Sequence, residues 1–143
     1  MNPFLFANAE FPKFSRNYME LKKGLPVRPS DMGVLNIIVQ TPGPHTSVML
    51  ADLLGVSKPM ITAHLSVLME KGYITKRQSS EDKRVYYILP TERALALVAA
   101  ANEETSSLLE SFIQAMGQAE FDTLVRLIAD ANRIMDAKRR LEE

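Results

Sequence analysis

The chain has 143 residues, 46% of them hydrophobic, and its 17 basic residues balance 17 acidic ones. This length suits one domain with a sizeable core, so we expect a single domain over residues 1–143. The absence of cysteine excludes disulfides, thiolate-zinc sites and redox switches based on thiols. Because Phe4-Leu5-Phe6 has neither a basic leader nor a long apolar run after it, we expect no signal peptide, no membrane partner and a cytoplasmic protein.

Two amphipathic helices are predicted before residue 45. In the first, apolar residues recur at steps of three and four, with Pro12 near the start and Gly24 near the end; they are Phe11, Phe14, Tyr18, Leu21 and Leu25. In the second, over residues 30–40, the inward positions are Met32, Leu35, Ile38 and Val39. The segment 41–44, which contains two prolines and a glycine, ends this helix.

A short helix followed by a glycine turn comes next. Thr46 is a candidate N-cap, and Gly55 is suited to the left-handed conformation that ends a helix. The positions expected to face the core are Leu50, Leu53 and Leu54. The turn is tight, because Ser57 can already cap the following helix.

The helix that follows has one apolar and one small or polar face. Ser57 caps it, Pro59 lies in its first turn, and Gly72 ends it. Its inward residues are Ile61, Leu65 and Leu68, and its outward residues are Lys58, Pro59, Thr62, Ala63 and Ser66. Such an outward face can lie in the major groove of DNA.

The pattern then changes to that of a β-hairpin. Residues 73–77 and 85–89 are rich in β-branched and aromatic residues, and a polar segment separates them. The hairpin cations are Lys76, Arg77, Lys83 and Arg84. Residues 58–84 contain six Lys or Arg and three Asp or Glu, a net charge of +3 that suits phosphate but is also common on a solvated surface. We expect Asp82 to pair with a cation and hold the hairpin tip, since a carboxylate aimed at phosphate would repel it.

Two helices and a basic hairpin in this order predict a winged helix-turn-helix. The chain resembles the multiple antibiotic resistance regulator (MarR) family in the segment Leu50-Ala51 to Ser57, the run Ile61-Thr62 to Leu68 with Glu70-Lys71-Gly72, and the wing signature Asp82-Lys83-Arg84 followed by Thr91. The resemblance implies a homodimeric DNA-binding regulator, usually a repressor, that is often released by a small aromatic ligand. It also implies that the second helix of the motif reads the major groove and that the wing arginine enters the minor groove.

Three positions depart from the family pattern. Ala63 follows Thr62 where many members carry an arginine, so a frequent DNA contact is missing and base preference does not transfer. Pro90 precedes Thr91, and Ala94 stands where a glycine is frequent. Pro90 lacks an amide donor and is not expected to continue a paired strand, whereas Thr91 is expected to cap the next helix.

The rest of the chain is predicted to be helical. An apolar seam interrupted by Gly117 runs through Leu95, Val98, Asn102, Thr105, Leu109, Phe112 and Met116, and then through Phe121, Leu124, Ile128, Ala131 and Met135. We expect residues 1–25 and 91–143 to form dimerisation helices around a winged-helix core over residues 30–90. The alternative is that these helices close the core of the monomer.

The predicted fold class is therefore mainly α with a small β-hairpin (α+β). The predicted DNA-binding residues are Ser57, Lys58, Pro59, Thr62, Ala63, Ser66, Arg77, Lys83 and Arg84, with Asp82 stabilising the wing. Phe14 and Tyr18, on an aromatic-rich helix, are predicted to contact a small aromatic effector. A different class of function is a winged-helix module for protein association without an operator, which the apolar Pro59, Met60 and Ala63 would permit.

Catalytic and metal-binding patterns are not found. The sequence has two histidines, His45 and His64, no glycine-rich phosphate loop and no helical two-histidine zinc motif. We therefore expect no enzyme activity, no cofactor and no metal, and we expect His64 to be structural or to face DNA.

Overall fold

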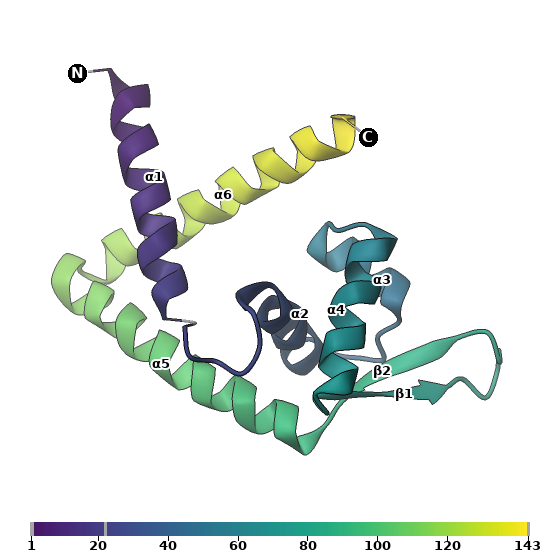
Figure 1. The fold of residues 1–143 in the computed structure, drawn as a ribbon. Coiled ribbons are helices and arrows are strands. Elements are labelled where there is room, and N and C mark those ends of the chain that lie inside the picture. The colour runs from purple at the N-terminus through teal and green to yellow at the C-terminus, as the bar shows by residue number, and fades with distance from the viewer. Residues whose placement is uncertain (1, 22, 143) are drawn as a thin grey trace. The chain divides into compact units, whose positions relative to one another are not determined.

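The computed structural model describes residues 2–21 and 23–142. The elements of this part of the chain are α1 (Pro3–Glu20), α2 (Pro29–Gln40), α3 (Ser47–Leu54), α4 (Lys58–Glu70), β1 (Ile74–Gln78), β2 (Tyr86–Pro90), α5 (Glu92–Met116) and α6 (Gln118–Glu142) (Figure 1). The predicted class, mainly α with one small hairpin, is confirmed. The chain forms two compact units, Met1–Ala101 and Asn102–Glu143.

The core of the first unit lies between the helix-turn-helix, α2 and the hairpin. Met32, Leu35, Leu50 and Leu68 are fully buried, so α2, α3 and α4 each contribute an apolar face. The hairpin adds Ile74 and Ile88, and the first turns of α5 add Ala94 and Val98. Burial of this apolar surface is the main stabilising contribution to the winged helix.

The two helices of the motif begin and end where capping chemistry predicts. The Thr46 hydroxyl accepts a hydrogen bond from the Met49 amide at 3.2 Å, and the Ser57 hydroxyl accepts one from the Met60 amide at 3.3 Å. Gly55 adopts φ +65°, the left-handed conformation expected at a helix C-terminus. These caps fix the short turn that sets α4 against α3.

The inward position predicted for Leu53 is wrong, because its side chain is 58% exposed. The core face of α3 is formed by Leu50 and Ala51, with Leu54 packed partly against it. At 100° per residue, Leu54 lies between Leu50 and Ala51 on the helix surface, whereas Leu53 lies beyond Leu50 on the far side. Three leucines, a valine and a methionine among the eight residues of α3 made the helix look apolar all round.

Helix α1 begins earlier than predicted. Asn2 caps it by accepting a hydrogen bond from the Phe4 amide at 2.9 Å, and Pro3 occupies the first turn, so this Asn-Pro pair is the start signal. Pro12, predicted near the start, lies inside the helix, where it removes one hydrogen bond without ending it. The helix ends at Glu20, and Leu25 lies outside it and packs against the core.

The hairpin is shifted by one residue from the predicted strands and includes Pro90. Ile74 of β1 is opposite Pro90 of β2 in an antiparallel register. The flanking Thr91 amide donates to the Tyr73 carbonyl at 3.0 Å, which places the Pro90 ring nitrogen on the edge that faces away from β1. Pro90 thus ends the strand without breaking a bond of the ladder.

Thr91 caps α5 as predicted. Its hydroxyl accepts a hydrogen bond from the Ala94 amide at 3.3 Å and donates one to the Gly72 carbonyl at 2.8 Å. The same residue therefore connects the end of the α4 segment, the base of the hairpin and the start of α5.

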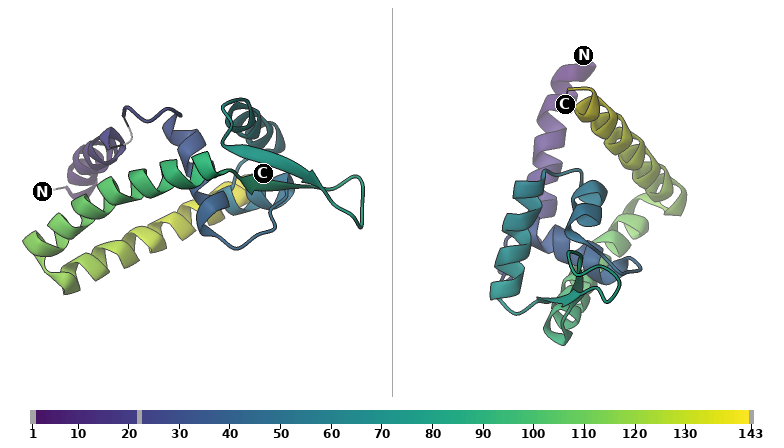
Figure 2. Two further views of the ribbon diagram at one scale, coloured as in Figure 1. Left: turned by 90° about the horizontal axis from the view of Figure 1, so that it is seen from below. Right: turned by 90° about the vertical axis from the view of Figure 1, so that its right-hand side faces the viewer.

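The second unit contains the end of α5 and the whole of α6, which Gly117 joins in a short turn at φ +91° (Figure 2). None of the described side chains of α1 or α6 is buried. Large apolar side chains of α6 are exposed, among them Leu127, Ile134 and Leu141. No helix in the described part of the chain is long and apolar enough to span a membrane.

Candidate nucleic-acid interface

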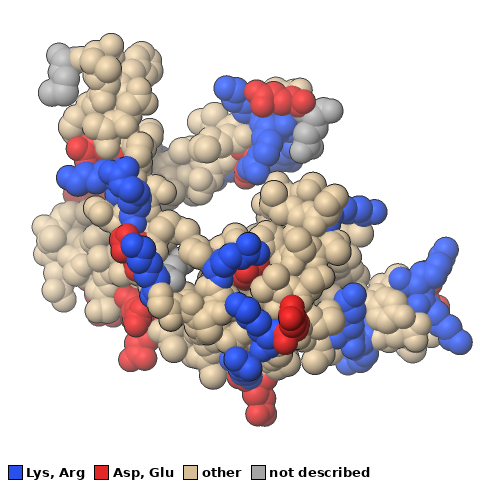
Figure 3. Space-filling view, viewed as in Figure 1, with Lys and Arg blue, Asp and Glu red and all other residues tan. Residues whose placement is uncertain are grey.

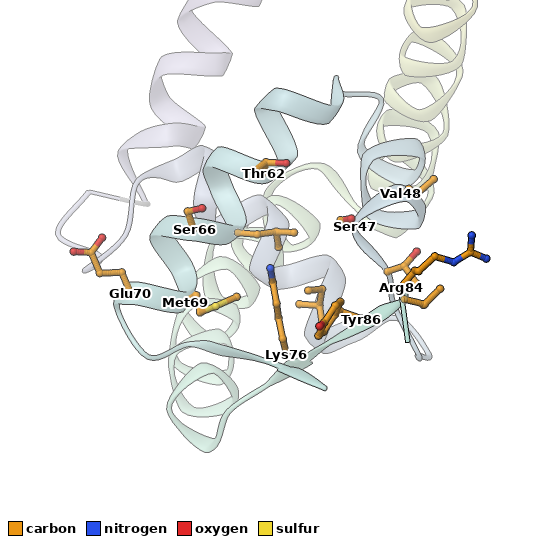
Figure 4. Close-up of a pocket in the computed structure, with 13 residues that line it drawn as sticks. Ser47, Val48, Thr62, Ser66, Met69, Glu70, Lys76, Arg84 and Tyr86 are labelled. Atoms are coloured by element: carbon orange, nitrogen blue, oxygen red, sulfur yellow. The ribbon is translucent and has the colours of Figure 1, made fainter. Parts of the chain in front are cut away.

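A groove of about 580 Å³ lies between α4, the start of α3 and the hairpin (Figure 4). Its polar lining comes from hydroxyls on two helices, from two cations of the hairpin and from the carboxylate of Glu70 at the end of α4; among the other polar lining residues are Ser47, Thr62, Ser66, Lys76, Arg84 and Tyr86. Hydroxyl donors and cations facing one concave surface are the groups that contact a phosphate backbone.

The structure brings only some of the predicted α4 residues into this groove. Thr62 and Ser66 line it. Lys58, Pro59 and Ala63 are exposed on α4 but are not part of the lining. Ser57 is the N-cap, and its hydroxyl is used within the helix. The outward face of α4 is thus divided between a hydroxyl edge that borders the groove and a small apolar edge beside it.

Lys76 is a groove residue that the sequence analysis left out of its predicted binding residues. Figure 4 shows its side chain rising from β1 into the groove beneath α4. Lys76 shares a hairpin face with the buried Ile74, whereas Arg77 points to the opposite face and lies over the Tyr87 ring at 6.0 Å. Side chains alternate between the two faces of a strand, so counting from Ile74 would have placed Lys76 on the same face as Ile74 and Arg77 on the opposite face.

The wing tip is organised around Asp82, as predicted. Its carboxylate accepts hydrogen bonds from the Arg84 backbone amide at 3.0 Å and from Nε and Nη2 of the Arg84 guanidinium, each at 3.1 Å. These bonds lower the pKa of Asp82 and raise that of Arg84, so both groups remain charged at neutral pH. The Arg84 side chain is 90% exposed, so a bidentate carboxylate aims a cation that still faces solvent.

The rest of the tip is tied by local hydrogen bonds. The Ser79 hydroxyl accepts from the amides of Glu81 and Asp82 at 3.2 and 3.3 Å. The Gln78 side-chain amide donates to the Lys83 carbonyl at 2.8 Å, while the Lys83 side chain itself is exposed. These hydrogen bonds brace the loop that carries the predicted wing cations.

A buried carboxylate fastens α4 to α2. Asp31 is fully buried and accepts hydrogen bonds from Nδ1 of His64 at 2.7 Å and from Nε of Arg28 at 3.0 Å. Burial alone would raise its pKa, but the bonds from Arg28 and His64 hold the pKa of Asp31 below its usual value. Of the two roles predicted for His64, the structure supports the structural one, because the ring contacts Asp31 and is only 12% exposed.

Positive charge gathers at the hairpin. In Figure 3 blue side chains cover the far end of the wing, which carries Lys83 and Arg84, whereas the surface over the upper end of α4 is mainly tan. The hairpin is therefore cationic, whereas α4 beside it is nearly neutral, with Lys58 and Glu70 as its only Lys, Arg, Asp or Glu residues.

The residues predicted to contact an effector lie on α1. The rings of Phe14 and Tyr18 stack with their centroids 6.1 Å apart and an angle of 18° between their planes. Phe14 is 43% exposed. The pair forms an accessible aromatic surface on this helix.

Residues 23–85 match the model of the MarR family. The matched segment covers the winged helix, from the residues before α2 to the hairpin loop. Among solved structures, FabT of Streptococcus pneumoniae in complex with DNA is similar at TM-score 0.79 and 18% identity, covering 94% of this chain and 98% of that one. A MarR protein from Peptoclostridium difficile is similar at TM-score 0.77 and 22% identity, covering 100% and 94%. The repressor CouR, bound to a 23-mer DNA duplex, is similar at TM-score 0.75 and 20% identity, covering 92% of each chain. The MarR fold thus extends beyond the matched segment.

Proposed function

We propose that this MarR-family protein is a sequence-specific DNA-binding transcription regulator that acts as a repressor. The observation that carries the proposal is the groove in which Thr62 and Ser66 of α4 face Lys76 and Arg84 of the hairpin. A helix with hydroxyls at its edge and a cationic hairpin beside it can occupy a major groove and the adjoining backbone together. The DNA complexes of FabT and CouR support the same use of the fold.

The proposed active form is a homodimer on a pseudo-palindromic operator. Each chain carries one winged helix, and the apolar residues left exposed on α1 and α6 suit a partner of the same kind. Two winged helices related by a twofold axis would read half-sites about one helical turn apart. Regulators of the MarR family are in general not enzymes, and we propose the same for this chain.

Selection of bound fragments from genomic DNA tests both parts of the proposal. The expected product is a palindromic site, and light scattering of the complex should then give two chains per duplex. A single chain on a single half-site, persisting at saturating protein, would contradict the dimer. Failure to enrich any sequence would contradict the regulator.

A module for protein association is the second candidate function, and Met60, which is 51% exposed at the start of α4, is the observation that favours it. The two functions differ in their response to salt. DNA affinity should fall steeply between about 50 and 200 mM salt, because counterions are released from phosphate. A contact through apolar residues should change little over the same range.

We further propose that a small aromatic ligand controls DNA binding through the α1 surface formed by Phe14 and Tyr18. A ligand shifts an equilibrium only by its difference in affinity for the two states, so an inducer must bind the free dimer more tightly than the DNA-bound one. Titration of salicylate with and without operator measures this difference. Equal affinities would exclude salicylate as an inducer, and release from DNA by peroxide alone would contradict ligand control.

A further inference from the structure

Apart from Lys58 at its first position, α4 lacks the side chains that distinguish purines by paired hydrogen bonds. The helix sequence Lys58–Glu70 contains no arginine, asparagine or glutamine. Its imidazole, His64, is held by Asp31 at 2.7 Å and turned toward α2. Bidentate recognition of guanine by arginine, or of adenine by an amide side chain, is therefore absent from this helix.

The first two turns of α4 offer methyl and methylene groups instead. Pro59, Thr62 and Ala63 are exposed on the outward face, and Met60 is exposed beside them. In the major groove, thymine is the base that presents an apolar group, its C5 methyl, and alanine and the threonine methyl are suited to contact it. The N-terminal residues of a recognition helix are those that reach base edges.

The charges around this apolar patch lie where they would contact the backbone. Lys76 and Arg84 come from the hairpin, and Lys58 is the one basic residue of α4. Glu70 follows Pro59 by eleven positions, about 16 Å along the helix, so its carboxylate lies away from the apolar patch. The cations can supply affinity without selecting a base, which leaves selection to the apolar patch.

From this arrangement we infer that α4 reads thymine methyl groups, so that the operator positions under Pro59, Thr62 and Ala63 are A·T pairs with thymine facing the helix. The inference rests on the proposed DNA-binding function. It assigns base selection to residues that make no base hydrogen bond, and it gives Ala63 a specificity role of its own.

Uracil substitution tests the inference because it removes the C5 methyl group and nothing else. An operator obtained by selection from random duplexes should contain thymines in the α4 contact positions. Replacing each one by deoxyuridine should lower affinity about fourfold, the value for one buried methylene-sized group. Deoxyuridine at thymines outside the α4 contact should leave affinity unchanged.

Variants of Ala63 connect the methyl effect to the helix. Ala63→Gly should abolish the uracil effect at one thymine and keep it at the others. Ala63→Arg should shift selection toward guanine at that position, because arginine adds a bidentate donor. Lys58→Ala is the matched control and should weaken binding to the thymine and uracil operators equally. Circular dichroism and thermal unfolding identify any variant that fails to fold.

The outcomes separate the inference from the function on which it rests. A selected operator with guanines under α4, or one indifferent to uracil, would overturn thymine reading while leaving the regulator intact. A parent protein without sequence preference would overturn the proposed function and the inference together. Deoxyuridine should no longer lower affinity at the contacted thymine in Ala63→Gly or in Pro59→Ala. If it still lowers affinity there in both variants, another part of the protein contacts the methyl group, which would overturn the role given to α4.

Discussion

Large apolar side chains are buried in the winged helix but exposed on the terminal helix α6. In the winged helix, Leu35, Leu50 and Leu68 are completely buried within one chain. In α6, Ile134 is 70% exposed and Leu141 is 88% exposed. Exposed apolar surface of this extent often marks an interaction site, so the comparison supports the proposal that a second copy covers α6.

The exposed stripe of α6 has the spacing of a helix–helix contact. Leu127, Ile134 and Leu141 recur every seven residues, which is the repeat of a seam between packed helices. This stripe lies beside the seam predicted from Leu124 and Ile128, and together they make one broad apolar face. We therefore expect the winged helix to supply the DNA contacts and the terminal helices to supply the surface for the proposed second copy.

The largest expected effect is on the terminal helices. Ile134→Asp should place a charge in the proposed interface of each copy, cost several kcal/mol per dimer, and yield monomers at micromolar concentration. Because Ile134 is exposed in the single chain, helicity should persist. Light scattering and circular dichroism measure both. Ala129→Asp, on the opposite face of α6, is the control and should stay dimeric; equal behaviour of the two variants would contradict this interface.

Leu68 is buried and Leu53 is exposed, so truncating each one tests how much burial contributes to the stability of the winged helix. Leu68→Ala should lower the free energy of unfolding by about 2–5 kcal/mol, because it leaves a cavity among fully buried side chains. Leu53→Ala, on the exposed side of α3, should change it by less than about 0.5 kcal/mol. Denaturant unfolding measures both values. A large loss for Leu53→Ala would mean that a partner covers this helix.

The buried Asp31 allows a test that depends on pH. Asp31→Asn should lower the free energy of unfolding by about 1–3 kcal/mol at pH 7, since the charged hydrogen bonds to His64 and Arg28 are lost. The pKa of Asp31 is lowered from 3.8, so its contribution is complete above that value and disappears as the pH falls through the folded pKa. Unfolding at pH 7 and pH 3 should show the gap between parent and variant shrinking in acid. If the difference in unfolding free energy between parent and variant were the same at pH 7 and pH 3, packing and not charge would account for it.

The caps of the winged helix were predictable because each depends on local chemistry. Thr46, Gly55, Ser57 and Thr91 lie where short side chains or a missing Cβ satisfy a helix end, and the structure confirms them. The order of helices and hairpin followed from hydrophobic spacing. Two predictions were wrong, the inward position of Leu53 and the start of α1. In both places apolar residues are so dense that their spacing alone does not identify the buried face of the helix or its first residue.

The groove was only partly predictable. Thr62 and Ser66 follow from the helical period, but Lys76 and Arg77 are adjacent cations that only the strand face distinguishes. The Asp31–His64 bond joins residues 33 positions apart, so its existence depends on how α2 packs against α4. Contacts of this kind depend on tertiary packing and leave no local pattern in the sequence.

The last test concerns the wing. Arg84→Ala should weaken operator binding by about 1–3 kcal/mol, as for an arginine inserted in a groove, and leave fold and dimer unchanged. Lys58→Ala should instead weaken binding evenly across sequences and reduce the salt slope, as for a phosphate contact. Fluorescence anisotropy over a salt series measures both. Parental affinity in Arg84→Ala would contradict the wing assignment.

Thr91 fixes the start of α5 to the base of the hairpin. The helix has 25 residues and is about 37 Å long, and its first residue follows directly after the hydrogen bonds of Thr91 to Gly72 and Tyr73. The first turns of α5 also carry Ala94 and Val98, which are buried in the core of the winged helix. One threonine thereby ties the direction in which α5 begins to the base of the wing.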